Sequence, residues 1–252
     1  MSRFDNDINF QFNKIIDESS NILLIESNKQ SLSRIFNNIY AINYLKNSAE
    51  LKVFINTEYF SITYSCLIET FSLILNNYTR ASSLVLRSAI ENYIKHLIQI
   101  INNEYDCNYN IHDRRYSDNK STLEMIILKE MKDCFKNDAN SANGRLDKNY
   151  NELSGLSHSL TENSRSNIIA YFNDITNKLD KVNINNIIIK LEETTFDIFM
   201  LLIIMCQPSF KHWVSTELES VLKIVFGVRK TKTYIENLKD DSTSNEVAVT
   251  SK

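Results

Sequence analysis

The chain contains only three glycines and one proline among its 252 residues. So little of either leaves few residues for the tight turns of β-hairpins or for glycine-rich loops that hold phosphates. The motifs GxGxxG, GxxxxGK(S/T), HExxH and GxSxG are also absent, which argues against dinucleotide binding, P-loop hydrolysis, zinc peptidases and the common serine hydrolases. Long helices tolerate such a composition, so we expect an all-α protein.

Cysteine is sparse too, and the four cysteines are scattered without a CxxC pair. Cys107 and His112 are close in sequence, but two ligands do not make a zinc site. A chain of this length buries enough apolar surface to fold without disulfide bonds. We therefore expect reduced, structural thiols, with no metal and no cofactor.

Long hydrophobic runs are missing as well. The longest uninterrupted run covers 198–206, which is far short of the roughly 20 residues that a membrane-spanning helix needs. The first residues lack the basic, then apolar, then small-residue order of a signal peptide. A formal net charge of -3 gives no sign of non-specific attraction to nucleic acid or anionic lipid. We expect a cytoplasmic protein with no membrane partner.

Apolar residues recur at helical spacing along most of the chain, which predicts a single helical bundle. Loops are expected over 104–120 and 138–145, where Asn and Asp are frequent and the period is lost. The order Ser-Thr-Leu-Glu from Ser121 has the capping-box spacing and predicts the start of a helix. The expected helices are 10–26, 30–47, 57–76, 80–103, about 15 residues from 121, 146–158, 164–180, 184–206 and 208–226.

No internal repeat and no strong shift of composition marks a domain boundary. We expect N-terminal helices in 1–55 that pack on the bundle or extend from it. The bundle itself is expected in 56–227, and a basic segment with a disordered tail in 228–252.

Two charged residues fall among apolar ones in the segment 79–101. A helical wheel places Arg87 and Glu91 within the same arc as Leu84 and Ile90, and places His96 on the opposite side. The two charges are one turn apart, so they are able to pair. Either they form a structural ion pair between helices, or they line a cleft or a dimer interface.

The second informative segment is 146–160. On the wheel, Tyr150, Leu153 and Ser154 share a face, and His158 lies at its edge in line with Asn151. Small hydroxyl residues on such a face let another helix approach closely. His158 either belongs to a site or simply interacts with the last carbonyls of the helix.

Together, LRSAIENYIKHLI (86–98) and YNELSGLSH (150–158) resemble the HEPN-like helical families of bacteria. The branch in question has an Arg-Ser-x-x-Glu helix followed by a Tyr-x-x-Leu-Ser-x-x-x-His helix, and the resemblance covers roughly 58–206. The matching residues are Arg87, Ser88 and Glu91 in the first motif, and Tyr150, Leu153, Ser154 and His158 in the second.

The resemblance implies a core of four or five helices that is often dimeric. Many members act in anti-phage defence, in toxin–antitoxin pairs or in RNA cleavage. The active ribonucleases use no metal, but an Arg followed four to six residues later by a His. His158 matches that His, whereas Asn151 and Glu152 stand where the Arg is required. Neither an amide nor a carboxylate replaces a guanidinium that stabilises phosphorane charge.

Three hypotheses follow from these residues. The first is a non-catalytic HEPN-like partner or sensor in a bacterial anti-phage defence or toxin–antitoxin type system, as a homodimer or in a hetero-complex. The second is a metal-independent endoribonuclease with His158 as general acid/base, Arg87 as its electrostatic partner and Glu91 beside them. In that case Tyr150, Asn151 and Ser154 support the site. The third is a structural helical domain whose polar face only orders packing.

RNA is a further expected partner, at two places. Arg114, Arg115 and Tyr116 lie in a segment that interleaves tyrosines with cations, which suits stacking on single-stranded RNA. The alternative is a solvated loop. A basic run near the C-terminus either contacts phosphate or complements a helix dipole. Its expected contacts are Arg229, Lys230 and Lys232.

Overall fold

A computed structural model of the chain describes residues 3–19, 21–157, 181–213 and 215–239. Over these residues it contains helices and no strand, which confirms the expected all-α class. The α-helices are α1 (Arg3–Asp17), α2 (Ile22–Asn47), α3 (Lys52–Ile55), α4 (Glu58–Leu75), α5 (Thr79–Glu104), α6 (Tyr116–Glu130), α7 (Asp133–Ser157), α10 (Lys181–Met205) and α11 (Ser215–Lys239), with short 3-10 helices η1 (Ala49–Leu51) and η2 (Gln207–His212).

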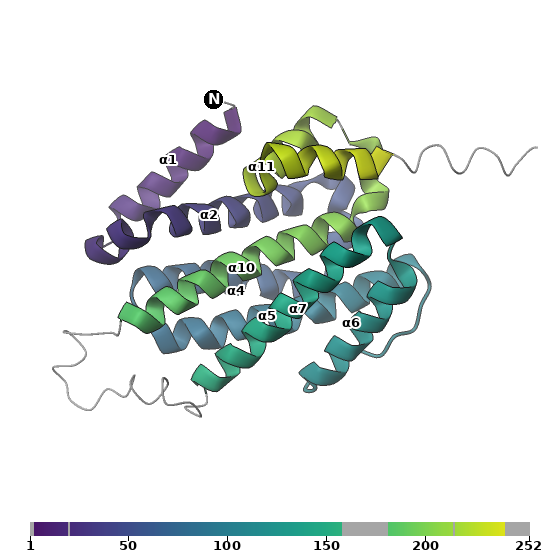
Figure 1. Cartoon of the computed structure of the whole chain (residues 1–252), viewed down its shortest axis with the longest axis horizontal. Helices are drawn as coiled ribbons and strands as arrows, with labels where there is room; N and C mark the ends of the chain where they lie inside the picture. Colours follow the sequence, from purple (N-terminus) through teal and green to yellow (C-terminus); the bar gives the residue numbers. More distant parts are fainter. Residues whose placement is uncertain (1–2, 20, 158–180, 214, 240–252) are drawn as a thin grey trace, which may run out of the picture.

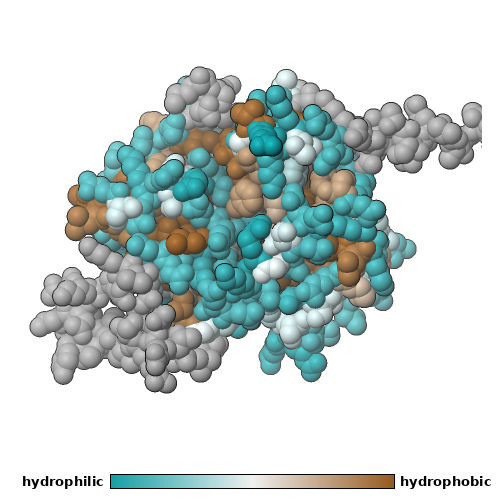
Figure 2. Space-filling model, viewed as in Figure 1, coloured by the Kyte–Doolittle hydropathy of each residue, from teal (hydrophilic) through white to brown (hydrophobic). Residues whose placement is uncertain are grey.

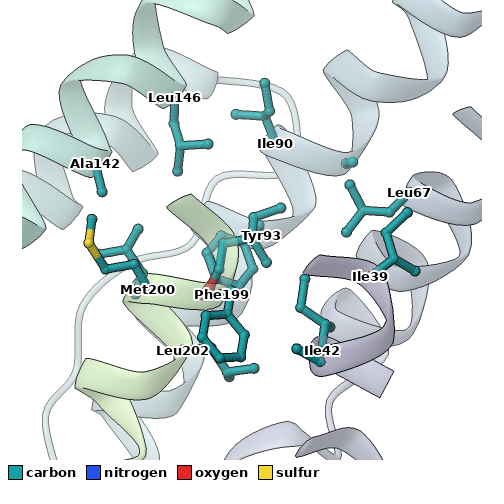
Figure 3. Packing of buried hydrophobic residues seen from close by; sticks show 14 of the residues in the cluster. Ile39, Ile42, Leu67, Ile90, Tyr93, Ala142, Leu146, Phe199, Met200 and Leu202 are labelled. Carbon is teal, nitrogen blue, oxygen red and sulfur yellow. Dashed lines mark hydrogen bonds between the residues drawn. The ribbon is translucent and has the colours of Figure 1, made fainter. Parts of the chain in front are cut away.

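Helices α5 and α10 lie at the centre of the bundle. Helix α10 packs against α2, α7, α4 and α5, while α5 packs against α4, α6, α7 and α10 (Figure 1). Where the two cross, Tyr93 of α5 lies beside Phe199 of α10 and donates a hydrogen bond to the carbonyl of Ile198 at 2.7 Å (Figure 3). The fully buried side chains of these two helices form the middle of one continuous core.

The N-terminal helix α2 belongs to this core. The side chain of Asn21 caps it by accepting a hydrogen bond from the Leu24 amide at 3.3 Å. Its apolar stripe is fully buried against neighbouring helices that include α10 and α11. Helix α1 packs on its outer side, where the rings of Phe12 and Phe36 lie 5.6 Å apart. Residues of the first 55 therefore contribute directly to the core of the bundle.

One of the two predicted loops was wrong, and the other is shorter than predicted. Residues 138–145 lie inside α7, where Ala139, Ala142 and Leu146 continue a fully buried stripe at helical spacing. Alanine is too small and weakly apolar to reveal that stripe beside Asn143 and Gly144. Helix α6 begins at Tyr116, five residues before the predicted capping box, so the loop expected over 104–120 covers only 105–115. In the first turn of α6, Tyr116 and Asn119 are already buried.

The C-terminal helix also differs from expectation. We expected the final helix to begin at Pro208. Pro208 instead lies near the start of η2, and α11 begins at Ser215. Helix α11 continues to Lys239 across a kink at Gly227, whose φ of 71° and ψ of 174° are non-helical. The basic run 228–232 thus lies on a helix. Residues 240–252 and the helix expected over 164–180 lie outside the described residues.

The visible surface is mostly hydrophilic, with brown apolar patches separated by polar side chains (Figure 2). In the part of the chain that the structure describes, no helix combines the length and the apolar character needed to cross a membrane.

Candidate functional site

The two motif helices meet at one contact between α5 and α7. The Arg87 guanidinium donates from Nη2 to the Tyr150 hydroxyl at 3.0 Å, and its carbon atom lies 5.0 Å from the centre of the Tyr150 ring. Tyr150 in turn stacks on Tyr116 of α6, with ring centroids 3.4 Å apart and planes inclined by 8°. We call Arg87, Tyr150 and Tyr116 the tyrosine clamp. It joins three helices through residues that the sequence had singled out for separate reasons.

The tyrosine clamp is largely closed to solvent. Tyr116 and Tyr150 are only 9% and 8% exposed, and one face of each ring is covered by the other. Burial raises the pKa of the Tyr116 hydroxyl far above its ordinary value, with Asp147 adding to the effect. Tyr116 is therefore held as a neutral packing residue, and its ring is not presented for stacking on a base.

The remaining motif residues have local roles. Glu91 pairs with Lys95 at 3.4 Å, one turn further along α5, and Lys95 also donates to the carbonyl of Asp113 at 2.9 Å. This links α5 to the segment that precedes α6. Ser154 donates to the Tyr150 carbonyl at 2.8 Å, as hydroxyls inside helices commonly do. Asn151 is exposed, and His158 lies outside the described residues, so its distance to Arg87 is not defined.

The predicted orientation of His96 was wrong. His96 is fully buried, its Nδ1 lies 2.7 Å from the Thr57 hydroxyl, and its ring centre lies 4.8 Å from that of Phe60. Burial lowers the pKa of His96 to about 3, so the imidazole is neutral. The wheel failed because α5 has neighbours on several sides, whereas the method assumes one buried face. For the same reason Leu84, placed among the core residues, is 46% exposed.

The expected RNA contacts divide into two kinds. Arg114, Arg115, Arg229 and Lys232 are exposed. Lys230 instead turns inward, and its ammonium lies 5.2 to 5.5 Å from the ring centres of Phe196, Phe226 and Tyr234. It also lies 3.6 Å from a carboxylate oxygen of Asp138. The Lys230 side chain is still 36% exposed, and a cation placed over these rings stabilises the contact of α11 with α7 and α10.

Sequence reasoning missed an ion pair between α7 and α10. Arg145 Nε lies 3.0 Å from Oδ2 of Asp197, and Nη2 donates to Oδ1. Asp197 is fully buried, and burial raises the pKa of its carboxyl to about 6 although Arg145 opposes the shift. The available signal was an Asp in the middle of the apolar helix 184–206. Its partner lay in the segment predicted to be a loop.

The ion pair lies beside a cavity of about 580 Å³. Side chains of α2, α7, α10 and α11 line it, and they include three cations, three carboxylates and several apolar residues. Among the described residues, those of this cavity included, no three His, Cys, Asp or Glu side chains gather in a way that could hold a metal ion.

Comparison with known proteins adds no identification: no family model, no curated protein and no solved structure matches the chain.

Proposed function

We propose that the protein is a non-catalytic, HEPN-like partner or sensor within a bacterial system of the anti-phage defence or toxin–antitoxin type. It acts as a homodimer or in a complex with another protein of that system. The observation that supports this function is the tyrosine clamp, in which residues of both motifs hold three helices together.

A catalytic arginine has to aim its guanidinium at a phosphate in an open site. Arg87 donates to Tyr150 and lies over its ring, and the far side of Tyr150 is stacked on Tyr116. The guanidinium therefore has a structural role that accounts for its position. Asn151 lies where active HEPN ribonucleases carry an arginine, and its amide cannot supply the positive charge.

Fixing three helices has a consequence for recognition. A surface built on α5, α6 and α7 is ordered before a partner arrives, so less conformational entropy is lost on binding. The exposed residues Arg114 and Arg115 lie in the segment between two of these helices. This is where we expect the first contacts with a partner.

The catalytic alternative is tested by RNA cleavage. Full-length protein and its His158→Ala variant are incubated with single-stranded and structured RNA, with and without a chelator. We expect no cleavage above that of a mock preparation, and no difference between the two proteins. Chelator-resistant cleavage that disappears in His158→Ala would overturn the proposal and establish the ribonuclease.

The partner role is tested by assembly. The tagged full chain is expressed in its native host, and the mass of the purified species is measured by light scattering. We expect a dimer, or a complex of fixed stoichiometry that an unrelated tagged helical protein does not form. A chain recovered alone as a monomer contradicts the proposal.

A further inference from the structure

The cavity beside Arg145 has the features of a small-molecule site. Its volume of about 580 Å³ is within the range of ligand pockets, which is roughly 300 to 1,000 Å³. Four helices that are distant in sequence meet around it, so its shape depends on the finished fold. None of the residues of the tyrosine clamp lines it.

Arg145 is fixed in the wall of this cavity by an ion pair in which one partner is fully buried and the other is partly exposed. Its Nε and Nη2 are held by the fully buried Asp197, yet the Arg145 side chain remains 41% exposed. Nη1 has no hydrogen-bond partner among the described residues, so its two N–H groups remain available. One edge of the guanidinium is therefore anchored, and the residue lines the cavity.

A second arginine of the wall is also paired, although more loosely. Arg34 Nε pairs with Glu192 at 3.1 Å, and both side chains line the cavity. Lys230 closes another part of the wall, with Asp138 beside it. The remaining carboxylate, Glu193, is exposed and accepts from Asn149 at 3.2 Å, so water screens its charge.

The rest of the wall is apolar. It is formed by Ile189, Phe196, Met200, Ile224 and Val225, which come from α10 and α11. A cavity lined by two paired arginines and by such apolar residues suits a molecule with one charged end and one apolar end. Arginine favours carboxylates and phosphates there, because its N–H groups match two oxygens at once.

We propose that this cavity binds a small organic anion, a carboxylate or phosphate ester on an apolar body, with Arg145 as the anchor for the anionic group. The inference rests on the cavity and the ion pair alone, and it does not depend on the function proposed above.

The test uses probes that separate charge from apolar surface. The probes are 1-naphthyl phosphate, 1-naphthaleneacetate, the neutral 1-naphthaleneacetamide and inorganic phosphate, each titrated calorimetrically into the full-length protein. We expect at least one of the two naphthyl anions to bind with a Kd below about 1 mM. The neutral amide and inorganic phosphate should bind at least about tenfold more weakly. Equal binding of the amide and the anions, or no binding of either anion, overturns the proposal.

A matched set of variants locates the site. Arg145→Met/Asp197→Leu removes both charges and retains a packed apolar pair, so the fold is expected to survive. Arg80→Gln removes an exposed arginine outside the cavity. Both variants are first checked for helical content and cooperative unfolding. We expect the double variant to lose at least about tenfold in affinity for the anion and Arg80→Gln to lose none. Unchanged affinity in the double variant, or an equal loss in both, refutes the assignment.

Discussion

The buried imidazole of His96 makes the stability of this protein depend on pH in a calculable way. The unfolded chain binds a proton at His96 below a pKa of 6.5, whereas the folded protein holds that pKa at about 3. Between these values the unfolded state binds more protons, so the free energy of unfolding falls as the pH falls. Burial is the cause, because the ring is fully enclosed and its Nε2 has no hydrogen-bond partner in the described structure.

The size of the effect follows from the separation of the two pKa values. Each pH unit below 6.5 costs about 1.4 kcal/mol until the folded pKa is reached. The loss from this one group is therefore about 2 kcal/mol at pH 5 and about 3.4 kcal/mol at pH 4. Against a total stability of about 5–15 kcal/mol for a typical domain, this is a large fraction.

Another buried group works in the opposite direction over the same range. The folded pKa of Asp197 is raised to about 6, so the stability linked to its protonation is present at low pH and is lost as the pH rises through that value. The wild-type pH profile alone therefore mixes the two groups. Comparison with a variant that lacks only the imidazole isolates His96.

The assay is urea unfolding at about pH 7.5 and about pH 5, followed by circular dichroism. The quantity compared is the change in unfolding free energy between the two pH values, because His96→Gln also alters packing at both. Between about pH 7.5 and about pH 5, we expect the unfolding free energy of wild type to fall by about 2 kcal/mol more than that of His96→Gln. His112→Gln, a change at a partly exposed histidine, serves as the control for a histidine substitution outside the core. If His96→Gln and wild type show the same pH difference, His96 titrates normally and its burial has no energetic consequence.

Four other substitutions test the ion pair, the backbone and the tyrosine clamp by urea unfolding. Arg145→Met leaves the Asp197 charge buried without its partner and should cost about 3 kcal/mol; a loss under about 1 kcal/mol would mean that Asp197 is neutral in the folded protein. Gly227→Ala should cost about 1–3 kcal/mol, since its φ of 71° with ψ of 174° disfavours a side chain although space is open. Gly144→Ala lies in a regular helix with equal space and should instead gain about 0.5–1 kcal/mol, so a shared sign would contradict the backbone argument. Tyr150→Phe removes the hydroxyl that accepts the guanidinium of α5 and should cost about 1 kcal/mol; no loss would show that the ring contacts alone hold the clamp.

Periodicity located the helices whose apolar stripes are made of large residues. The expected helices 57–76, 80–103 and 184–206 correspond closely to α4, α5 and α10. It located the second half of α7 but missed the first, where the buried Ala139 and Ala142 lie among polar residues. A pattern of small residues carries little hydropathy, but it marks where helices approach closely.

The candidate residues were harder to place than the helices. Motif spacing selected Arg87 and Tyr150, and the fold brings them into contact. It gave no means of pairing Arg145 with Asp197, because that contact depends on which helix lies beside α10. His96 was misplaced for the same reason, since burial on the second side of α5 is decided by its other neighbours.

Buried polar contacts also explain why this bundle has one arrangement. Isoleucine and leucine pack acceptably in more than one register, so an apolar core alone specifies a helix pair weakly. A slip of one turn between α7 and α10 would separate Arg145 from Asp197 and leave a charge buried, which costs several kcal/mol. The buried hydrogen bond from Asn38 to the Thr195 hydroxyl at 3.0 Å fixes α2 against α10 in the same manner.

The need to align helices is enough to explain the tyrosine clamp. It does not explain why one partner of the Arg145–Asp197 pair remains partly exposed. A contact that serves only to align two helices is most effective when both partners are enclosed, as Asn38 and Thr195 are. Arg145 is instead 41% exposed while Asp197 is fully buried, and Arg145 lines a cavity that further packing could have filled. We infer that the open edge of this guanidinium is maintained for a ligand, whereas its inner edge is maintained for the fold.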